Sequence, residues 1–139
     1  MVILFDGVCN LCNWWVRFIL KHDKNSVFKF ASLQSKYGIQ LLAYYKLPLA
    51  PLETVLLYDR KELYSHSDAI IKISSKLTGI YKIGSVFKYL PRFIRDFFYR
   101  IIAKSRYGLF GKRKQCMIPE ENMKSRFLDD TPFIPEQQV

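Results

Sequence analysis

Two cysteines stand three residues apart near the start of the chain, and their spacing suits redox chemistry. Cys9 and Cys12 directly follow the apolar run at residues 2–5, where a strand would pass into a helix. On a first helical turn, Cα atoms three residues apart are separated by about 5 to 6 Å, which is within the range of a disulfide. The partial positive charge of a helix N-terminus favours a thiolate. We therefore predict that Cys9 attacks a substrate and that Cys12 resolves the mixed disulfide.

Asp6 lies three residues before Cys9 and is the third candidate for catalysis. A buried carboxylate at this position could accept the proton of the resolving thiol as a general base. The alternative role is structural, because an Asp side chain at the end of a strand can cap the turn that follows. We favour the catalytic role, since a polar group at the end of a buried strand needs a reason.

The cysteine pair has two other interpretations, a zinc site and inert packing. A zinc site needs two more ligands, for which Cys116, His22 and His66 are available. The chain has no second Cys-x-x-Cys and no closely spaced histidine pair, so we predict neither a metal nor an organic cofactor. Cys116 itself is an isolated thiol. Its commoner role would be that of a small buried hydrophobe, and a second redox step with the pair is the alternative.

The composition indicates one domain and excludes several classes of protein. Half of the 139 residues are apolar, including 22 aromatics, which is enough for a core without disulfides. Three cysteines are too few, and odd in number, for a secreted disulfide scaffold. No apolar run approaches the roughly 18 residues of a membrane span, and the first run is too short for a signal peptide. We expect a cytoplasmic protein, where a Cys-x-x-Cys pair is more often catalytic or metal-binding than structural.

Charge is distributed unevenly along a chain that carries +10 overall. Residues 82–114 hold ten Lys or Arg residues against one acid, together with eight aromatics. Residues 115–139 hold two basic residues against five acids. We interpret 1–139 as a single domain with a core at 1–81, a basic helical extension at 82–118 and an acidic tail at 119–139 that ends loosely.

Hydrophobic periodicity and turn residues predict the elements that position the dithiol. The predicted strands cover residues 2–5, 27–31, 54–59 and 62–64, the last two joined in a hairpin by Arg60-Lys61. The predicted helices run from residue 9 or 10 to 22, from a cap at Ser32 with an interruption near Gly38, from Ser67 to near Gly79, and over 91–105. The order strand, helix, strand, helix, hairpin, helix predicts an α/β protein with a thioredoxin-like core and a helical C-terminal extension.

The basic segment at 82–114 has three interpretations. In the first, the apolar stripe of the helix at 91–105 covers the sheet and the charges are merely solvated. That stripe comprises Phe93, Ile94, Phe97, Phe98, Ile101 and Ile102. In the second, the segment lies on an anionic membrane surface. In the third, it binds an acidic protein or nucleic acid, but the chain contains no nucleic-acid recognition motif, so we do not expect nucleic acid as a partner.

The string Asp6-Gly7-Val8-Cys9-Asn10-Leu11-Cys12-Asn13 resembles the signature of the DCC family of thiol-disulfide oxidoreductases, named for an Asp-x-x-Cys-x-x-Cys motif. Three later stretches also resemble blocks of that family. The second block is matched by Ser67-Asp68-Ala69-Ile70, the third by Pro91, Asp96, Tyr99 and Arg106-Tyr107, and the last by Cys116 followed by Pro119. The resemblance spans residues 2–128. It implies a thioredoxin-like fold and dithiol chemistry on a protein or small-molecule thiol or disulfide.

One feature departs from true thioredoxins, which place a cis-proline immediately before the strand that faces the redox pair. The nearest proline here, Pro51, stands three residues before Thr54. The sequence therefore predicts a thiol-disulfide oxidoreductase with Cys9, Cys12 and Asp6 as its catalytic residues. The alternative is a non-enzymatic binding module with a structural or zinc-bound cysteine pair and a basic amphipathic face for an anionic membrane or an acidic partner.

Overall fold

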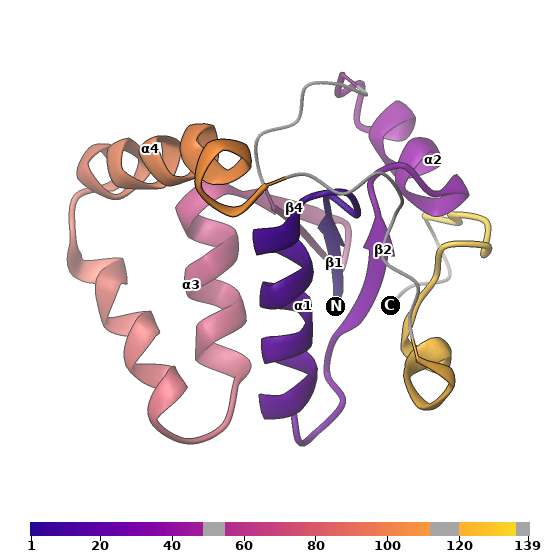
Figure 1. Cartoon of the computed structure of the whole chain (residues 1–139), viewed down its shortest axis with the longest axis horizontal. Helices are drawn as coiled ribbons and strands as arrows, with labels where there is room; N and C mark the ends of the chain where they lie inside the picture. Colours follow the sequence, from indigo (N-terminus) through magenta and orange to yellow (C-terminus); the bar gives the residue numbers. More distant parts are fainter. Residues whose placement is uncertain (49–54, 112–119, 136–139) are drawn as a thin grey trace.

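Four short strands form one mixed sheet in the computed structural model, which describes residues 1–48, 55–111 and 120–135 (Figure 1). Within these residues the strands are β1 (Val2–Phe5), β2 (Lys29–Ser32), β3 (Leu56–Asp59) and β4 (Glu62–Ser65). Their order across the sheet is β2-β1-β3-β4, with β1 parallel to β2 and antiparallel to β3. This is a thioredoxin-like arrangement, and it confirms the predicted fold class.

Helices cover both faces of the sheet, because the strand side chains alternate between two apolar clusters. The described helices are α1 (Asn10–His22), α2 (Lys36–Tyr44), α3 (His66–Lys76) and α4 (Arg92–Phe110), with 3-10 segments η1 (Gly79–Tyr89) and η2 (Glu121–Arg126). Ile3 and Phe5 of β1 pack with residues of α1 and α3, which lie side by side on one face (Figure 1). Val2 and Leu4 pack with α2 on the other face. The core therefore has two layers with β1 at its centre.

Strand β2 begins two residues later than the sequence predicts. The carboxylate of Asp23 accepts hydrogen bonds from the backbone N–H groups of Val27 at 3.1 Å and Phe28 at 2.9 Å. These two residues are thereby held outside the regular strand, and pairing with β1 begins at Lys29. The predicted hairpin between β3 and β4 is confirmed. Arg60 and Lys61 both adopt positive φ angles, as in the tight turns that match strand twist.

Helix α2 is capped by Ser35, so the predicted cap at Ser32 is wrong. The Ser35 hydroxyl accepts a hydrogen bond from the N–H of Gly38 at 3.1 Å, while Ser32 is the last residue of β2. Gly38 lies inside the helix and does not interrupt it. A Cβ atom at Gly38 would lie only 2.3 Å from the carbonyl oxygen of Ser32. Glycine is therefore needed here because helix and strand approach each other closely.

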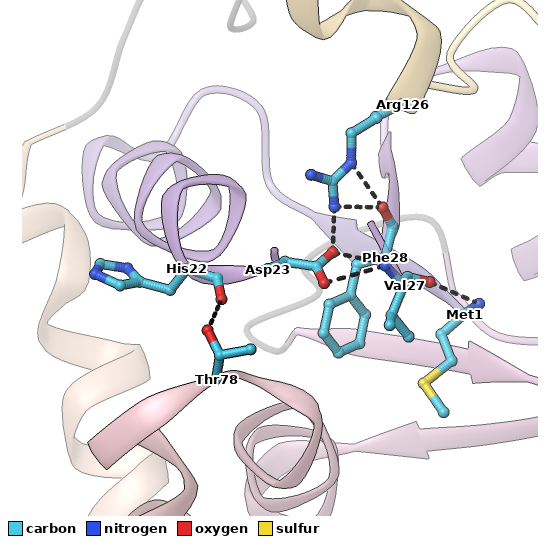
Figure 2. A network of polar contacts seen from close by, with 7 residues as sticks. All are labelled: Met1, His22, Asp23, Val27, Phe28, Thr78 and Arg126. Carbon is cyan, nitrogen blue, oxygen red and sulfur yellow. Dashed lines mark hydrogen bonds and ion pairs between the residues drawn. The ribbon is translucent and has the colours of Figure 1, made fainter. Parts of the chain in front are cut away.

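The described part of the acidic tail packs against β2, which corrects the expectation of a loose end. The Arg126 guanidinium donates to the carbonyl of Phe28 at 2.8 and 3.0 Å and forms an ion pair with Asp23 (Figure 2). The N–H of Leu128 then donates to the carbonyl of Phe30 at 2.8 Å. The physical reason is that the Asp23 carboxylate is almost fully buried and Arg126 neutralises it.

Helix α4 turns its apolar stripe outward, so the prediction that this stripe covers the sheet is wrong. Phe93 is 75% exposed, Phe97 is 61% exposed and Ile102 is 57% exposed. The helix also runs five residues beyond the predicted end at Ser105. Of the helices that the structure describes, none is long and apolar enough to cross a bilayer.

Polar contacts fix the opposite side of α4 to the start of α3 and explain why the stripe faces outward. The Ser67 hydroxyl donates a hydrogen bond to the Asp96 carboxylate. The Asp68 carboxylate pairs with Arg92 at 2.9 Å and with Arg95 at 3.2 Å. A helix whose charged residues are bound in this way cannot also turn its phenylalanines toward the sheet, because the two sets lie on different sides of it.

Candidate functional site

Cys9 and Cys12 lie at the N-terminus of α1, where the sequence predicts them. Cys9 is the N-cap residue with an extended backbone, and its Sγ accepts a hydrogen bond from the backbone N–H of Cys12 at 3.4 Å. Both residues are free thiols. Cys9 has no exposed surface and Cys12 is 6% exposed. The geometry places the Cys9 sulfur at the positive end of the helix dipole.

The C-terminal end of α4 lies against the residue that follows Cys9. The Asn10 side chain donates a hydrogen bond to the carbonyl of Phe110 at 2.8 Å, and its backbone N–H lies 3.4 Å from the carbonyl oxygen of Gly111. Gly111 has a φ of +78°, the left-handed conformation that often ends a helix. Sequence reasoning missed this contact. A glycine at a helix end signals the cap but not the partner that it reaches.

Asp6 is buried in the turn that leads into Cys9. Its Oδ1 accepts hydrogen bonds from the backbone N–H of Val8 at 3.2 Å and from the Gln34 side chain at 2.8 Å. The backbone carbonyl of Asp6 accepts from the N–H of Cys9 at 3.2 Å. These contacts are those of a turn cap, and they also hold a carboxylate next to the dithiol loop. Both roles considered for Asp6 are compatible with this position.

Two amide side chains that sequence reasoning missed hold the same turn from both sides. Gln34, just after β2, accepts a hydrogen bond from the N–H of Gly7 at 3.2 Å. Asn13, next to Cys12, donates to the carbonyl of Gly7 at 3.0 Å. The other amide atom of Asn13, Oδ1, is buried and has no hydrogen-bond partner among the described residues. The loop that presents the dithiol is thus fixed by groups from β1, α1 and the segment after β2.

An apolar cavity of about 340 Å³ lies beside Cys12. Residues of α1, α3, α4 and the start of β3 line it, and they are Leu11, Cys12, Trp14, Trp15, Val55, Ile70, Tyr99, Ile102 and Ala103. The Tyr99 hydroxyl accepts a hydrogen bond from the N–H of Val55 at 2.9 Å, so this polar group is already engaged. The surroundings of the dithiol on this side are therefore almost wholly apolar.

Ser67 and Asp68 do not line this cavity, which α3 borders through Ile70 instead. They form the first turn of α3, as predicted, and they also bind α4. The hydrogen bond from Ser67 holds the pKa of Asp96 below its ordinary value of 3.8, against the opposing effect of burial. These residues therefore position α4, and with it Tyr99 and the cavity wall.

The residues considered for a zinc site do not come together in the part of the chain that the structure describes. His22 ends α1, ten residues beyond Cys12 and so about 15 Å along the helix, and its Nδ1 lies 2.8 Å from the carbonyl oxygen of Phe18. His66 starts α3 beside Tyr99. No group of three or more His, Cys, Asp or Glu residues in the described ranges is placed to hold a metal. Cys116, Pro119 and Pro51 fall outside those ranges.

Comparison with known proteins gives one family and two curated relatives. A family model described as DCC1-like thiol-disulfide oxidoreductase matches residues 3–112. The uncharacterized protein YuxK of Bacillus subtilis is 42% identical over 127 residues, which make up 91% of this chain and 93% of that protein. A chloroplastic DCC family protein of Arabidopsis thaliana is 35% identical over 116 residues, which make up 83% of this chain and 67% of that protein. No solved structure matches the chain.

Proposed function

Because the chain belongs to the DCC1-like thiol-disulfide oxidoreductase family, we propose that it catalyses thiol–disulfide exchange with Cys9 and Cys12 as its redox dithiol. The observation that carries this proposal is the position of Cys9. Its sulfur caps α1 and accepts a hydrogen bond from the N–H of Cys12, so the two thiols belong to one helical turn at the start of α1. The substrate class is a protein or small-molecule disulfide or dithiol. The proposed compartment is the cytoplasm, where the low cysteine content suits a reducing environment.

The exchange has two balanced steps. For a disulfide substrate, the Cys9 thiolate attacks one substrate sulfur and a new S–S bond forms. The substrate S–S bond breaks, and its electron pair leaves with the other sulfur, which takes a proton. The Cys12 thiol then loses its proton to Asp6 and attacks the sulfur of Cys9, and the second substrate thiol leaves. The substrate gains two electrons from the dithiol and two protons, one that Cys12 gave up to Asp6 and one from solvent, because Cys9 reacts as the thiolate. The reverse sequence oxidises a dithiol substrate.

Burial of Cys9 adds one requirement to this mechanism. Since Cys9 has no exposed surface, a substrate sulfur reaches it only when groups around it move. The end of α4 is hydrogen-bonded to Asn10, the residue that follows Cys9. The proposal therefore includes a displacement of Phe110 and Gly111 before the first attack. The second attack needs no such opening, since both thiols belong to the same turn.

A redox titration tests the proposed function. The purified protein is equilibrated in glutathione buffers of graded potential, and free thiols are trapped with an alkylating reagent that adds a known mass. We expect a two-electron transition in which peptide mapping links Cys9 to Cys12. The Cys9→Ser variant should lose this transition, and the Cys116→Ser variant should keep it. A pair that stays reduced in every buffer, or that alkylates only after chelation, would contradict the proposal.

A second candidate function, binding to an anionic membrane surface, is favoured by the exposed side of α4. The apolar residues of α4 that are more than one third exposed recur mostly at helical spacing. These residues are Phe93, Phe97, Phe98, Ile101, Ile102, Leu109 and Phe110. The preceding η1 exposes Ile83, Val86, Phe87 and Tyr89 in the same way, and Leu90, which follows it, is also exposed. An exposed apolar surface of this extent marks an interaction site.

Charge favours an anionic bilayer as the occupant of this surface. Lys82, Lys88, Arg100 and Lys104 are exposed on the same two elements. Arg100 and Lys104 also line a cavity of about 280 Å³ together with His66, which suits an anionic headgroup. Basic residues beside exposed Phe and Ile side chains are the pattern of helices that lie on anionic lipid. The surface formed by η1 and α4 would thus lie on the membrane without crossing it.

Vesicle flotation tests this second function. At low salt we expect the protein to float with phosphatidylserine-containing vesicles and to stay in solution with pure phosphatidylcholine. The Phe97→Asp/Phe98→Asp variant should lose flotation, whereas Ile39→Asp, at an exposed apolar residue of α2, should keep it. A protein that remains in solution with both vesicle types would contradict the proposal. A dimer that the double variant dissociates would instead assign the surface to a second copy of the chain.

A further inference from the structure

The apolar cavity has Cys12, the resolving thiol of the proposed exchange, in its wall. Cys9 is hydrogen-bonded to the backbone of Cys12. A substrate sulfur bonded to Cys9 would therefore carry its neighbouring groups to the mouth of this cavity. Because the volume of about 340 Å³ falls at the lower end of small-ligand sites, it suits one side chain or one small ring system.

The chemistry of the wall determines what the cavity can hold. Its lining consists of aliphatic and aromatic side chains together with the thiol of Cys12, and the Tyr99 hydroxyl is engaged with the backbone of Val55. None of the lining residues is charged. A charged group placed there would lose most of its hydration, whereas an apolar group would be stabilised by burial.

We propose that this cavity is a substrate-binding site for an apolar group next to the reacting sulfur, so that the protein prefers disulfides flanked by an aromatic or aliphatic side chain. This inference rests on the proposed thiol–disulfide exchange and specifies its substrate class. Glutathione, which is polar and charged, fits the cavity poorly. The preferred substrate is therefore a cysteine in an apolar peptide segment, and α4 contributes to the choice through Tyr99, Ile102 and Ala103.

Two matched peptides test the preference. They differ only in the residue before their cysteine, Phe in one and Gln in the other, and each cysteine forms a mixed disulfide with the same chromogenic thiol. The reduced full-length protein should release the thiol from the Phe peptide faster, on the order of tenfold, because burial of the ring stabilises the bound state. Equal rates for the two peptides would overturn the inference.

Substitution of the cavity wall tests its location. Ala103→Phe should fill the cavity and reduce the ratio of the two rates to near one, whereas Ala43→Phe, at an exposed position of α2, should leave it unchanged. Ile102→Gln, at a side chain that is already 57% exposed, provides a second variant that leaves the core intact, and it should lower the ratio in part. A ratio that stays high in both cavity variants would overturn the assignment to this site.

Binding without chemistry separates this inference from the proposed function. The two tryptophans of the chain, Trp14 and Trp15, both line the cavity. A Phe peptide with Ala in place of its cysteine should therefore change the tryptophan fluorescence on binding, and the corresponding Gln peptide should not. If this difference appears but neither disulfide peptide releases thiol, the cavity assignment is supported and the proposed exchange fails. If thiol is released without any difference between the peptides, the exchange stands and the cavity assignment fails.

Discussion

The side chain of Asn10 donates a 2.8 Å hydrogen bond to the carbonyl of Phe110, although the two residues are 100 positions apart in the chain. Asn10 stands between the two cysteines, and Phe110 is the last residue of α4. The end of the C-terminal extension is thus attached to the redox motif itself. Because Cys9 is fully buried, this attachment bears directly on how a substrate reaches it.

Loss of the Asn10 side chain should expose the nucleophile. The Asn10→Ala variant removes the bond to Phe110, and we expect Cys9 to be alkylated several-fold faster because a bond worth about 1 kcal/mol no longer opposes displacement of α4. The measurement is the rate of modification of Cys9 under native conditions, read by peptide mass. Asn25→Ala, at an exposed turn, serves as the control. An unchanged rate in Asn10→Ala would show that α4 does not limit access.

Removal of the resolving thiol should trap the first intermediate. In Cys12→Ser the attack by Cys9 can occur but its mixed disulfide has no neighbouring thiol to release it. We expect a stable adduct on Cys9 after incubation with a disulfide substrate, and little adduct on Cys12 in the converse Cys9→Ser variant. Intact-protein mass spectrometry followed by peptide mapping measures both. A stable adduct on Cys12 with none on Cys9 would reverse the proposed order of attack.

Asp6 can be tested with a substitution that keeps its hydrogen-bonding shape. In Asp6→Asn the side-chain oxygen can still accept the N–H of Val8, but the negative charge is lost. If Asp6 takes the proton of Cys12, resolution of the mixed disulfide should slow by about tenfold or more. Unchanged kinetics would leave Asp6 as a turn cap, with Asp130→Asn as the exposed control.

The contact between α3 and α4 should weaken in acid. The hydrogen bond from Ser67 lowers the pKa of Asp96 in the folded state. The hydrogen bond therefore contributes its full stabilisation at pH values above 3.8, the ordinary pKa of an Asp side chain, and this stabilisation is lost as the pH falls through the pKa of the folded state. Ser67→Ala should lower the free energy of unfolding by about 1 to 2 kcal/mol at about pH 7 and by less at about pH 3. Urea unfolding at both pH values measures this. An equal loss at both would contradict the assignment, and Glu121→Gln is the exposed control.

The packing of the tail against the core makes Arg126 a sensitive position. Arg126→Ala would leave the nearly fully buried carboxylate of Asp23 without its cation, and we expect the free energy of unfolding to fall by about 3 kcal/mol. Lys124→Ala, on the same 3-10 segment, removes only an exposed pair with Glu121 and should cost less than about 1 kcal/mol. Chemical denaturation of the two variants side by side is the measurement. Equal losses would show that Asp23 does not depend on Arg126.

The position of Cys9 and Cys12 at the start of α1 and the order of the elements around them were predictable from the sequence, because both depend on near neighbours. A strand at residues 2–5, a helix that starts after Cys9 and a hairpin at Arg60-Lys61 each follow from apolar periodicity or turn chemistry within a few residues. The thioredoxin-like sheet then follows from that order.

Tertiary structure alone decided which segment binds Asn10 between the two cysteines and which side of α4 faces outward. Periodicity identified the stripe of α4 but not its partner, and the polar side packs inward because Ser67 and Asp68 bind Asp96, Arg92 and Arg95. The contacts of Asn10 with Phe110 and of Asp23 with Arg126 join residues about one hundred positions apart. Such pairs form only once the whole chain has folded, because closing so long a loop costs entropy that no local pattern repays.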